Sequence, residues 1–178
     1  MAGITGDRDK IKLGPQRVSF GASGAEVVLG FTSGGVELTY DVTYVQIMVD
    51  QLGSPVDLRF SGEVLKAKVN LSEISQDNFL IAFPAASAAS GAASAVGVNF
   101  GRRPGYSVAQ NASGVLILHP IGKDDADLSE DWTFPIAVNQ GSVTLPYKVD
   151  QETIVPLEFL AIADPAREDG QHLARYGY

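Results

Sequence analysis

Two long strand patterns on either side of the turn-forming segment 50–57 constrain the fold of this chain more than any other feature. Between residues 36 and 44, apolar side chains stand at even positions and polar ones at odd positions. This period of two is typical of a strand that buries one face. From Val45 onward the apolar residues fall on odd positions, and the second arm, residues 58–72, also changes phase, next to Val64. The segment therefore predicts a long antiparallel hairpin.

One register brings the two phase changes together. It places Asp41 opposite Lys68 and Asp50 opposite Arg59, so that opposite charges face each other across the strands. In this register the distal third of the hairpin is apolar on the face opposite to the apolar face of the root. Either a bend inside one β-sandwich or an arm that reaches onto a neighbouring molecule would explain the inversion. The apolar pairs of this register are Tyr44 with Leu65, Val42 with Ala67, Tyr40 with Val69, Leu38 with Leu71, Val45 with Val64, and Val49 with Phe60.

The composition indicates a single, mainly β domain. The chain has 178 residues, of which 45% are hydrophobic and 19% charged, and its 19 Gly and 9 Pro separate many short apolar runs. The fold class that we expect is a β-sandwich or barrel with one short α-helix and the long protruding hairpin. We interpret residues 1–178 as one domain with an N-terminal arm (1–10), a flexible small-residue loop (84–104) and a C-terminal tail (164–178).

The helix is expected directly after the hairpin. Asn70 and Glu73 have the spacing of a capping box, which predicts a helix from there to about Ala82, ended by Pro84. The segment 85–97 that follows is almost pure Ala, Ser and Gly. It is either a mobile surface loop, the interpretation that we favour for a free monomer, or a loop that becomes ordered between subunits.

Residues that carry chemistry are few. The net charge of −8 disfavours tight binding to nucleic-acid phosphates, and the absence of Cys excludes disulfides and thiolate metal sites. His119 and His172 lie far apart in the sequence, without carboxylates at metal-ligand spacing. The acidic run 123–131 lacks the glycine of a calcium loop and predicts a solvated loop. We therefore expect no enzyme activity, no cofactor and no metal.

No segment predicts export or a membrane span. The first ten residues are charged and contain no apolar core, so we expect no signal peptide. The longest apolar runs are far too short to cross a bilayer.

Several short segments, in the same order along the chain, resemble bacteriophage tail tube (major tail) proteins. The early segments are 11–15 with 18–20, 29–36 and 49–53, and the later ones are 71–73 and 154–159. The resemblance implies a structural virion protein whose hexameric rings stack into a hollow tube for genome delivery. It also implies assembly in the host cytoplasm, other tail proteins at the tube ends, and DNA that passes through without specific binding.

In that family, the loop that corresponds to residues 50–58 helps to stack the rings. The resemblance therefore assigns a ring-stacking interface to the distal hairpin. Two alternatives stay open: a monomeric β-sandwich that serves as a binding or decoration module, and a tube subunit of a bacterial contractile or secretion machine. The candidate stacking residues are Ile47, Val49, Asp50, Gln51, Leu52, Pro55, Val56, Leu58, Arg59 and Phe60.

Overall fold

A computed structural model describes residues 14–89, 97–150 and 152–177. The expected N-terminal arm and most of the small-residue segment lie outside these ranges. The longer strands are β1 (Gln16–Ala22), β2 (Ala25–Val28), β3 (Thr32–Met48), β4 (Pro55–Leu71), β7 (Gly114–Pro120), β8 (Trp132–Asn139) and β9 (Val155–Ala161). The short elements are β5 (Ser87–Ala88), β6 (Val98–Asn99), β10 (Arg175–Tyr176), the helices α1 (Gln76–Ala82) and α2 (Val108–Asn111), and the 3₁₀ helix η2 (Leu128–Glu130).

One antiparallel sheet organises the molecule, and the prediction of a mainly β fold is confirmed. Its strand order is β2-β1-β7-β8-β9-β4-β3, with β10 also paired to β8. The small β5–β6 ribbon pairs Ser87 with Asn99 inside the segment that the sequence predicted as a flexible loop. Because β3 and β2 stand at the two ends of the order, each leaves one edge without a strand partner in the described parts of the chain.

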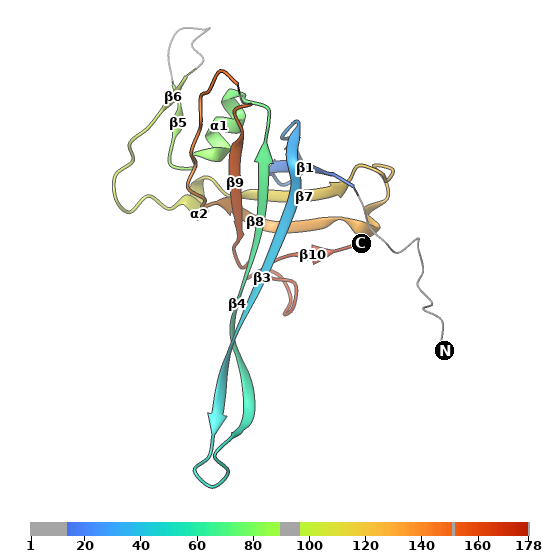
Figure 1. The fold of residues 1–178 in the computed structure, drawn as a ribbon, viewed down its shortest axis with the longest axis vertical. Coiled ribbons are helices and arrows are strands. Elements are labelled where there is room, and N and C mark those ends of the chain that lie inside the picture. The colour runs from blue at the N-terminus through green and yellow to red at the C-terminus, as the bar shows by residue number, and fades with distance from the viewer. Residues whose placement is uncertain (1–13, 90–96, 151, 178) are drawn as a thin grey trace.

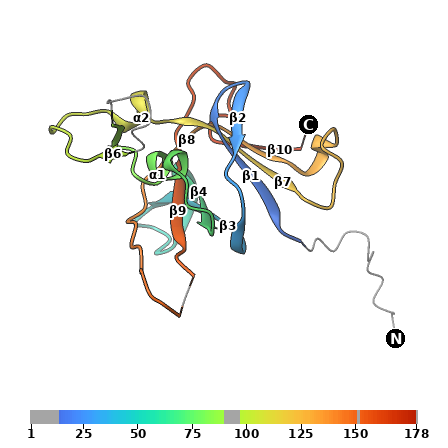
Figure 2. The ribbon, with the colours of Figure 1, turned by 90° about the horizontal axis from the view of Figure 1, so that it is seen from above.

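The sheet folds over on itself and encloses the core. In Figure 1, β7 and β8 run across the view, whereas β3, β4 and β9 follow the long axis. The view from above shows β3, β4 and β9 on one side and β1, β2 and β7 on the other (Figure 2). Phe20 of β1 and Phe159 of β9, which are separated by two strands in the sheet order, have ring centroids only 5.0 Å apart. That contact is possible only because the two halves face each other across the core.

Helix α1 begins later than the sequence predicted. Its N-cap is Ser75, whose Oγ accepts a hydrogen bond from the Asn78 backbone N–H at 3.1 Å. Asn70, the expected cap, instead lies in β4 opposite Pro156 of β9. Since the next residue, Leu71, is completely buried, the strand must continue past Asn70, and a helix cannot start there. The expected end at Ala82 is confirmed.

Two further expectations are corrected. Residues Val108–Asn111 form helix α2, so the described chain has two α-helices where one was expected. The C-terminal segment is not a free tail, because β10 pairs Tyr176 with Trp132 of β8, and Leu173 packs against the core. The rings of Trp132 and Tyr176 lie 5.1 Å apart.

Candidate functional site

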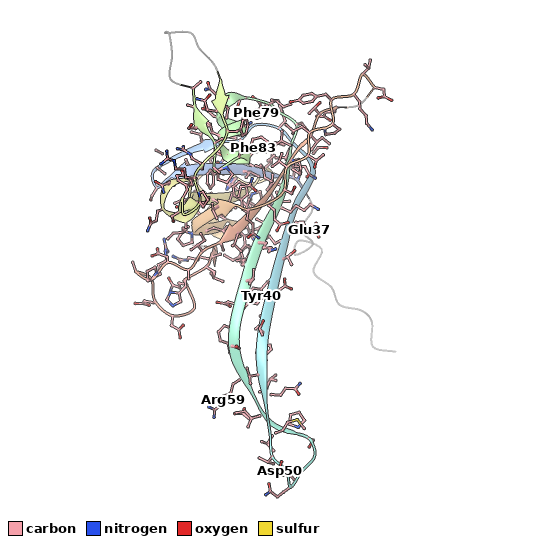
Figure 3. All side chains as sticks on the ribbon, turned by 90° about the vertical axis from the view of Figure 1, so that its left-hand side faces the viewer. Glu37, Tyr40, Asp50, Arg59, Phe79 and Phe83 are labelled. Atoms are coloured by element: carbon pink, nitrogen blue, oxygen red, sulfur yellow. The ribbon has the colours of Figure 1, made fainter. Side chains whose placement is uncertain are left out.

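The β3–β4 hairpin extends far beyond the body of the protein. Each of its strands has 17 residues. At the root, β4 also pairs with β9 over Lys66–Leu71, so the hairpin is anchored in the sheet. Beyond Leu65 no third strand accompanies it in the described chain, and the distal half projects alone from the body (Figure 1). Figure 3 shows Asp50 near its tip and Arg59 on the projecting part, with Tyr40 closer to the body.

The observed register differs from the predicted one. Tyr40, rather than Tyr44, lies opposite Leu65, and Tyr44 lies opposite Phe60. Neither expected charge pair forms across the strands. The observed partners are Glu37 for Lys68, Val64 for Asp41, and Val45 for Arg59, while Asp50 lies in the turn outside the ladder.

A β-bulge explains the phase change of the second arm. Thr43 pairs with Gly62 and Tyr44 with Phe60, so Ser61 is an extra residue on β4. Such a bulge shifts the alternation of one strand by one position. Phe60 therefore stays on the same face as Leu65, because cross-strand partners share a face. The predicted inversion of the apolar face is wrong for Leu58 and Phe60 and holds for Val45 and Ile47 of β3. The sequence prediction assumed an unbroken ladder, in which the phase change of the second arm had to coincide with that of the first.

The structure places all ten candidate stacking residues on this distal half. Ile47 and Val49 are half-buried, whereas the other eight are exposed. Leu52 in the turn keeps 65% of its surface accessible and Phe60 in β4 keeps 59%. Sequence reasoning did not include several neighbours that are also large, apolar and exposed: Tyr40, Tyr44, Val45, Met48 and Val64. Together with the apolar candidates, these neighbours form a large apolar surface on both faces of the two-stranded ribbon, and it stays exposed among the described residues.

Polar contacts on the hairpin are local. The Arg59 Nε donates to Asp57 Oδ2 at 3.2 Å, and both side chains are largely exposed. Closer to the root, the Tyr40 hydroxyl donates a hydrogen bond to Glu63 Oε2, and this bond raises the pKa of Tyr40. An exposed pair of either kind contributes little to stability. These contacts order the ribbon without offering a catalytic group.

A buried histidine lies in β7, which two strands separate from β4 of the hairpin in the sheet order, and the sequence did not predict its environment. His119 of β7 is 2% exposed, and its Nδ1 lies 2.8 Å from Asp131 Oδ1. Asp131 is itself buried, so the acidic run 123–131 is not simply a solvated loop. Lys123 also bonds Asp127 and Glu130 inside this run, at 2.9 and 3.3 Å. Hydrogen bonds from Ser129 and Lys123 hold the pKa of the Asp127 carboxyl below its usual range.

The described residues contain no cluster of three or more His, Asp or Glu side chains that could hold a metal ion. No helix in the same ranges is both long and apolar enough to span a bilayer. Comparison of the chain with protein-family models and with curated proteins found no match.

Proposed function

We propose that the protein is a structural subunit that assembles with copies of itself through the distal half of the β3–β4 hairpin. The observation that carries the proposal is the apolar surface of a projecting ribbon that no other part of the described chain covers. Leu52, Leu58 and Phe60 each keep more than half of their surface accessible, at 65%, 54% and 59%. Removing apolar surface from water contributes roughly 25 cal/mol per Å². Association with a partner that covers the ribbon would therefore be strongly favourable.

The shape of the hairpin favours head-to-tail assembly. The ribbon protrudes from the body (Figure 1). It therefore fits a different surface on a second copy better than it fits the same ribbon of that copy. Contacts between two different patches of the same protein are heterologous, and they produce closed rings or open stacks depending on the rotation between subunits. The edges of β2 and β3, which have no strand partner in the described chain, add places where neighbouring sheets can pair.

The resemblance to phage tail tube proteins supplies the form of the assembly. In this proposal hexameric rings stack into a tube, with the hairpin of each subunit reaching onto the next ring, as part of a virion tail. The net charge of −8 suits a conduit for DNA, because a negatively charged wall repels phosphates and does not retain the moving polymer. No catalytic step is part of this function.

The decisive experiment compares the wild-type protein with a double variant, Leu58→Ser with Phe60→Ser. Light scattering and electron microscopy across a concentration and salt series should show rings or tubes for the wild type and only monomers for the variant. Raising the salt concentration should promote stacking, because it screens the repulsion between subunits of like charge. Circular dichroism and the thermal midpoint of the monomer should be nearly unchanged, since both side chains are exposed.

The matched control is Tyr147→Ser with Val149→Ser, which removes two other exposed apolar side chains away from the hairpin. If this control abolished assembly as completely as the hairpin variant, general loss of apolar surface, and not the hairpin, would explain the effect. A wild-type protein that remained monomeric at every condition would overturn the proposal and favour a binding or decoration module. Tight binding to duplex DNA would also contradict it.

A further inference from the structure

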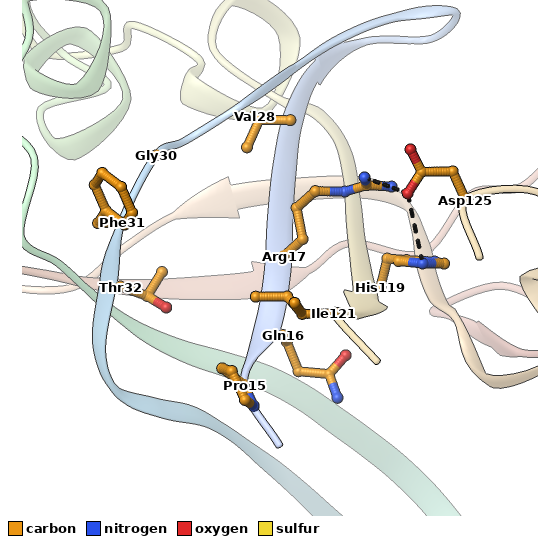
Figure 4. A pocket seen from close by; sticks show the side chains of 10 residues that line it. All are labelled: Pro15, Gln16, Arg17, Val28, Gly30, Phe31, Thr32, His119, Ile121 and Asp125. Atoms are coloured by element: carbon orange, nitrogen blue, oxygen red, sulfur yellow. Dashed lines mark hydrogen bonds and ion pairs between the residues drawn. The ribbon is translucent and has the colours of Figure 1, made fainter. Parts of the chain in front are cut away.

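A pocket of about 600 Å³ lies next to the buried His119, remote in sequence from the hairpin tip. Its wall is mainly apolar, with Val28, Phe31 and Ile121 exposed at its surface. Figure 4 shows the end of the Arg17 side chain beside Asp125 and the His119 ring below it, each joined to Asp125 by a dashed line. Arg17 Nη1 lies 2.6 Å from Asp125 Oδ1. The same oxygen is 4.0 Å from His119 Nε2, which is too far for a hydrogen bond.

The buried pair with Asp131 determines which nitrogen of His119 carries the proton. An ionised carboxylate only accepts hydrogen bonds, so Asp131 holds the proton on Nδ1, 2.8 Å away. In the neutral ring Nε2 is then an acceptor. This atom is buried and has no hydrogen-bond partner among the described residues. Leaving a buried acceptor without a partner is destabilising, so a donor supplied from outside would be stabilised there.

The 4.0 Å between His119 Nε2 and Asp125 Oδ1 separates two acceptors that one donor atom can bridge. Two hydrogen bonds of about 2.8 Å that meet at roughly a right angle span such a distance. Charge points to a cationic donor. Arg17 and Asp125 of the lining carry opposite charges, and Asp131, which is not in the lining, adds a negative charge behind His119. These four side chains are therefore negative overall when the imidazole is neutral. Asp125 is well placed to adjust to a ligand, because its side chain is 78% exposed.

We propose that this pocket binds a primary alkylammonium group, with its N–H groups donating to His119 Nε2 and Asp125 Oδ1. The alkyl chain packs on the apolar wall formed by Val28, Phe31 and Ile121. Two further buried atoms of the same lining lack a described partner, the acceptor Gln16 Oε1 and the donor Arg17 Nε. The amine is either a free small molecule or the end of a lysine side chain, and both present the same chemistry.

Nitrogen-15 NMR of the two histidines tests the proposal directly. With no amine present, His119 should show the neutral tautomer that is protonated on Nδ1. At pH 8 an alkylamine is still protonated, because amines of this kind titrate near pH 10. Adding n-butylammonium chloride should then shift the His119 Nε2 resonance in a saturable way. His172, which is not part of the pocket lining, should stay unchanged and serves as an internal control.

Control ligands and variants separate this site from trivial explanations. n-Butanol lacks the charge and tetramethylammonium lacks the N–H donors, so neither should reproduce the shift. Nα-acetyl-lysine amide should bind as well as n-butylammonium if a lysine end is accepted, and not at all if only a free small amine is. Asp125→Asn should weaken binding by about tenfold or more, since it removes a charged hydrogen bond. Glu152→Gln removes the same charge outside the pocket lining and should leave the affinity unchanged.

Three results would overturn the proposal. The first is a free protein whose His119 carries its proton on Nε2. The second is a response to n-butanol equal to that to n-butylammonium, which would indicate a site for a water or hydroxyl group only. The third is a response that survives intact in Asp125→Asn or appears equally at His172, which would indicate a general ionic effect.

Discussion

The root and the distal half of the β3–β4 hairpin are made of the same two strands, yet only the root is buried. At the root, Ala67, Val69 and Leu71 have no accessible surface. Nearer the tip of the same strand, Leu58 and Phe60 are more than half exposed. The distal residues are no less apolar than those of the root, and the bulge at Ser61 keeps them on the same face. The difference between the two halves therefore does not lie in the strand pattern.

What differs is the presence of a second layer. Over Lys66–Leu71, β4 pairs with β9, and the folded sheet brings Phe20 and Phe159 together in the enclosed core. Beyond Leu65 the hairpin has neither a third strand nor an opposing layer in the described chain. An alternating pattern shows which face a strand can bury, and only the layer against it decides whether that face is buried. The proposed assembly surface is this apolar ribbon without such a layer.

The largest expected difference in stability is between alanine substitutions of Phe159 in the core and Phe60 on the distal half. Phe159→Ala, at a position with no accessible surface, should lower the free energy of unfolding by about 3–5 kcal/mol, because it leaves a cavity in the core. Phe60→Ala should change it by less than about 0.5 kcal/mol, because the ring is exposed. Urea unfolding at a concentration where both proteins are monomeric measures the two values. A large loss for Phe60→Ala would mean that the distal half belongs to the cooperative core of the monomer.

The next prediction tests the register of β3 against β4 in the distal half. The pair Tyr44→Cys with Phe60→Cys should form a disulfide, since direct antiparallel partners lie about 4.5–5.5 Å apart at Cα, within disulfide range. The pair Tyr44→Cys with Leu65→Cys should not, because those positions are several residues out of register. The wild type has no Cys, so mass spectrometry reports each crosslink cleanly. The first disulfide should stabilise the protein by at most about 2–4 kcal/mol. Equal crosslinking of both pairs would indicate that the strands slide past each other.

The sequence was sufficient for the arms of the hairpin and insufficient for their register. Alternation over residues 36–44 predicted strand β3, and the turn residues between the arms predicted its reversal. The bulge at Ser61 could not be read from the pattern, because a phase change in one arm looks the same whether it marks a bulge or an inverted face. As a result, charge matching across the strands selected a regular ladder that does not form. For the candidate site, the sequence predicted residues of the distal hairpin, which the structure places on the projecting ribbon, and misassigned which of their side chains share a face.

Tertiary contacts explain the other differences. Asn70 and Glu73 satisfy the spacing of a helix cap, yet the pairing of Asn70 with Pro156 of β9 takes precedence over that local preference. The bond from His119 to Asp131 joins residues twelve positions apart that lie on either side of a loop. Neither spacing nor composition marks such a pair, because folding alone brings the two side chains together.

A smaller difference in stability is expected between alanine substitutions of two hairpin glycines. Gly35, at the irregularity near the root, has φ +79°, a conformation that disfavours L residues with a side chain. Gly35→Ala should therefore cost about 1–2 kcal/mol. Gly62, next to the distal bulge, has no positive φ, and a Cβ added there would meet open space, so Gly62→Ala should be neutral or stabilising by about 0.4–1 kcal/mol. Thermal unfolding of both variants measures the contrast. Equal losses would show that the distal bulge is as constrained as the root.

The smallest effect should distinguish the ion pairs of the two halves. At the root, Lys66 Nζ lies 2.9 Å from Glu158 Oε1, and both side chains are about two-thirds buried. On the distal half, Arg59 Nε lies 3.2 Å from Asp57 Oδ2, with both side chains mostly exposed. Glu158→Gln should therefore destabilise the protein at pH 7 by about 0.2–1 kcal/mol, whereas Asp57→Asn should have no measurable effect.

The contribution of the root ion pair to stability should depend on pH. The hydrogen bond from Lys66, followed by that from Gln140, lowers the pKa of Glu158 in the folded protein. The folded state therefore binds this proton less readily than the unfolded chain does. The stability that the Glu158 carboxylate contributes is fully present above its pKa in the unfolded chain, about 4.3. It is lost as the pH falls through the lower pKa of the folded protein. The stability difference between wild type and Glu158→Gln, measured by urea unfolding, should thus shrink on acidification. A difference that stayed constant down to about pH 2 would show that the Glu158 charge does not contribute, and that the side chain acts through packing alone.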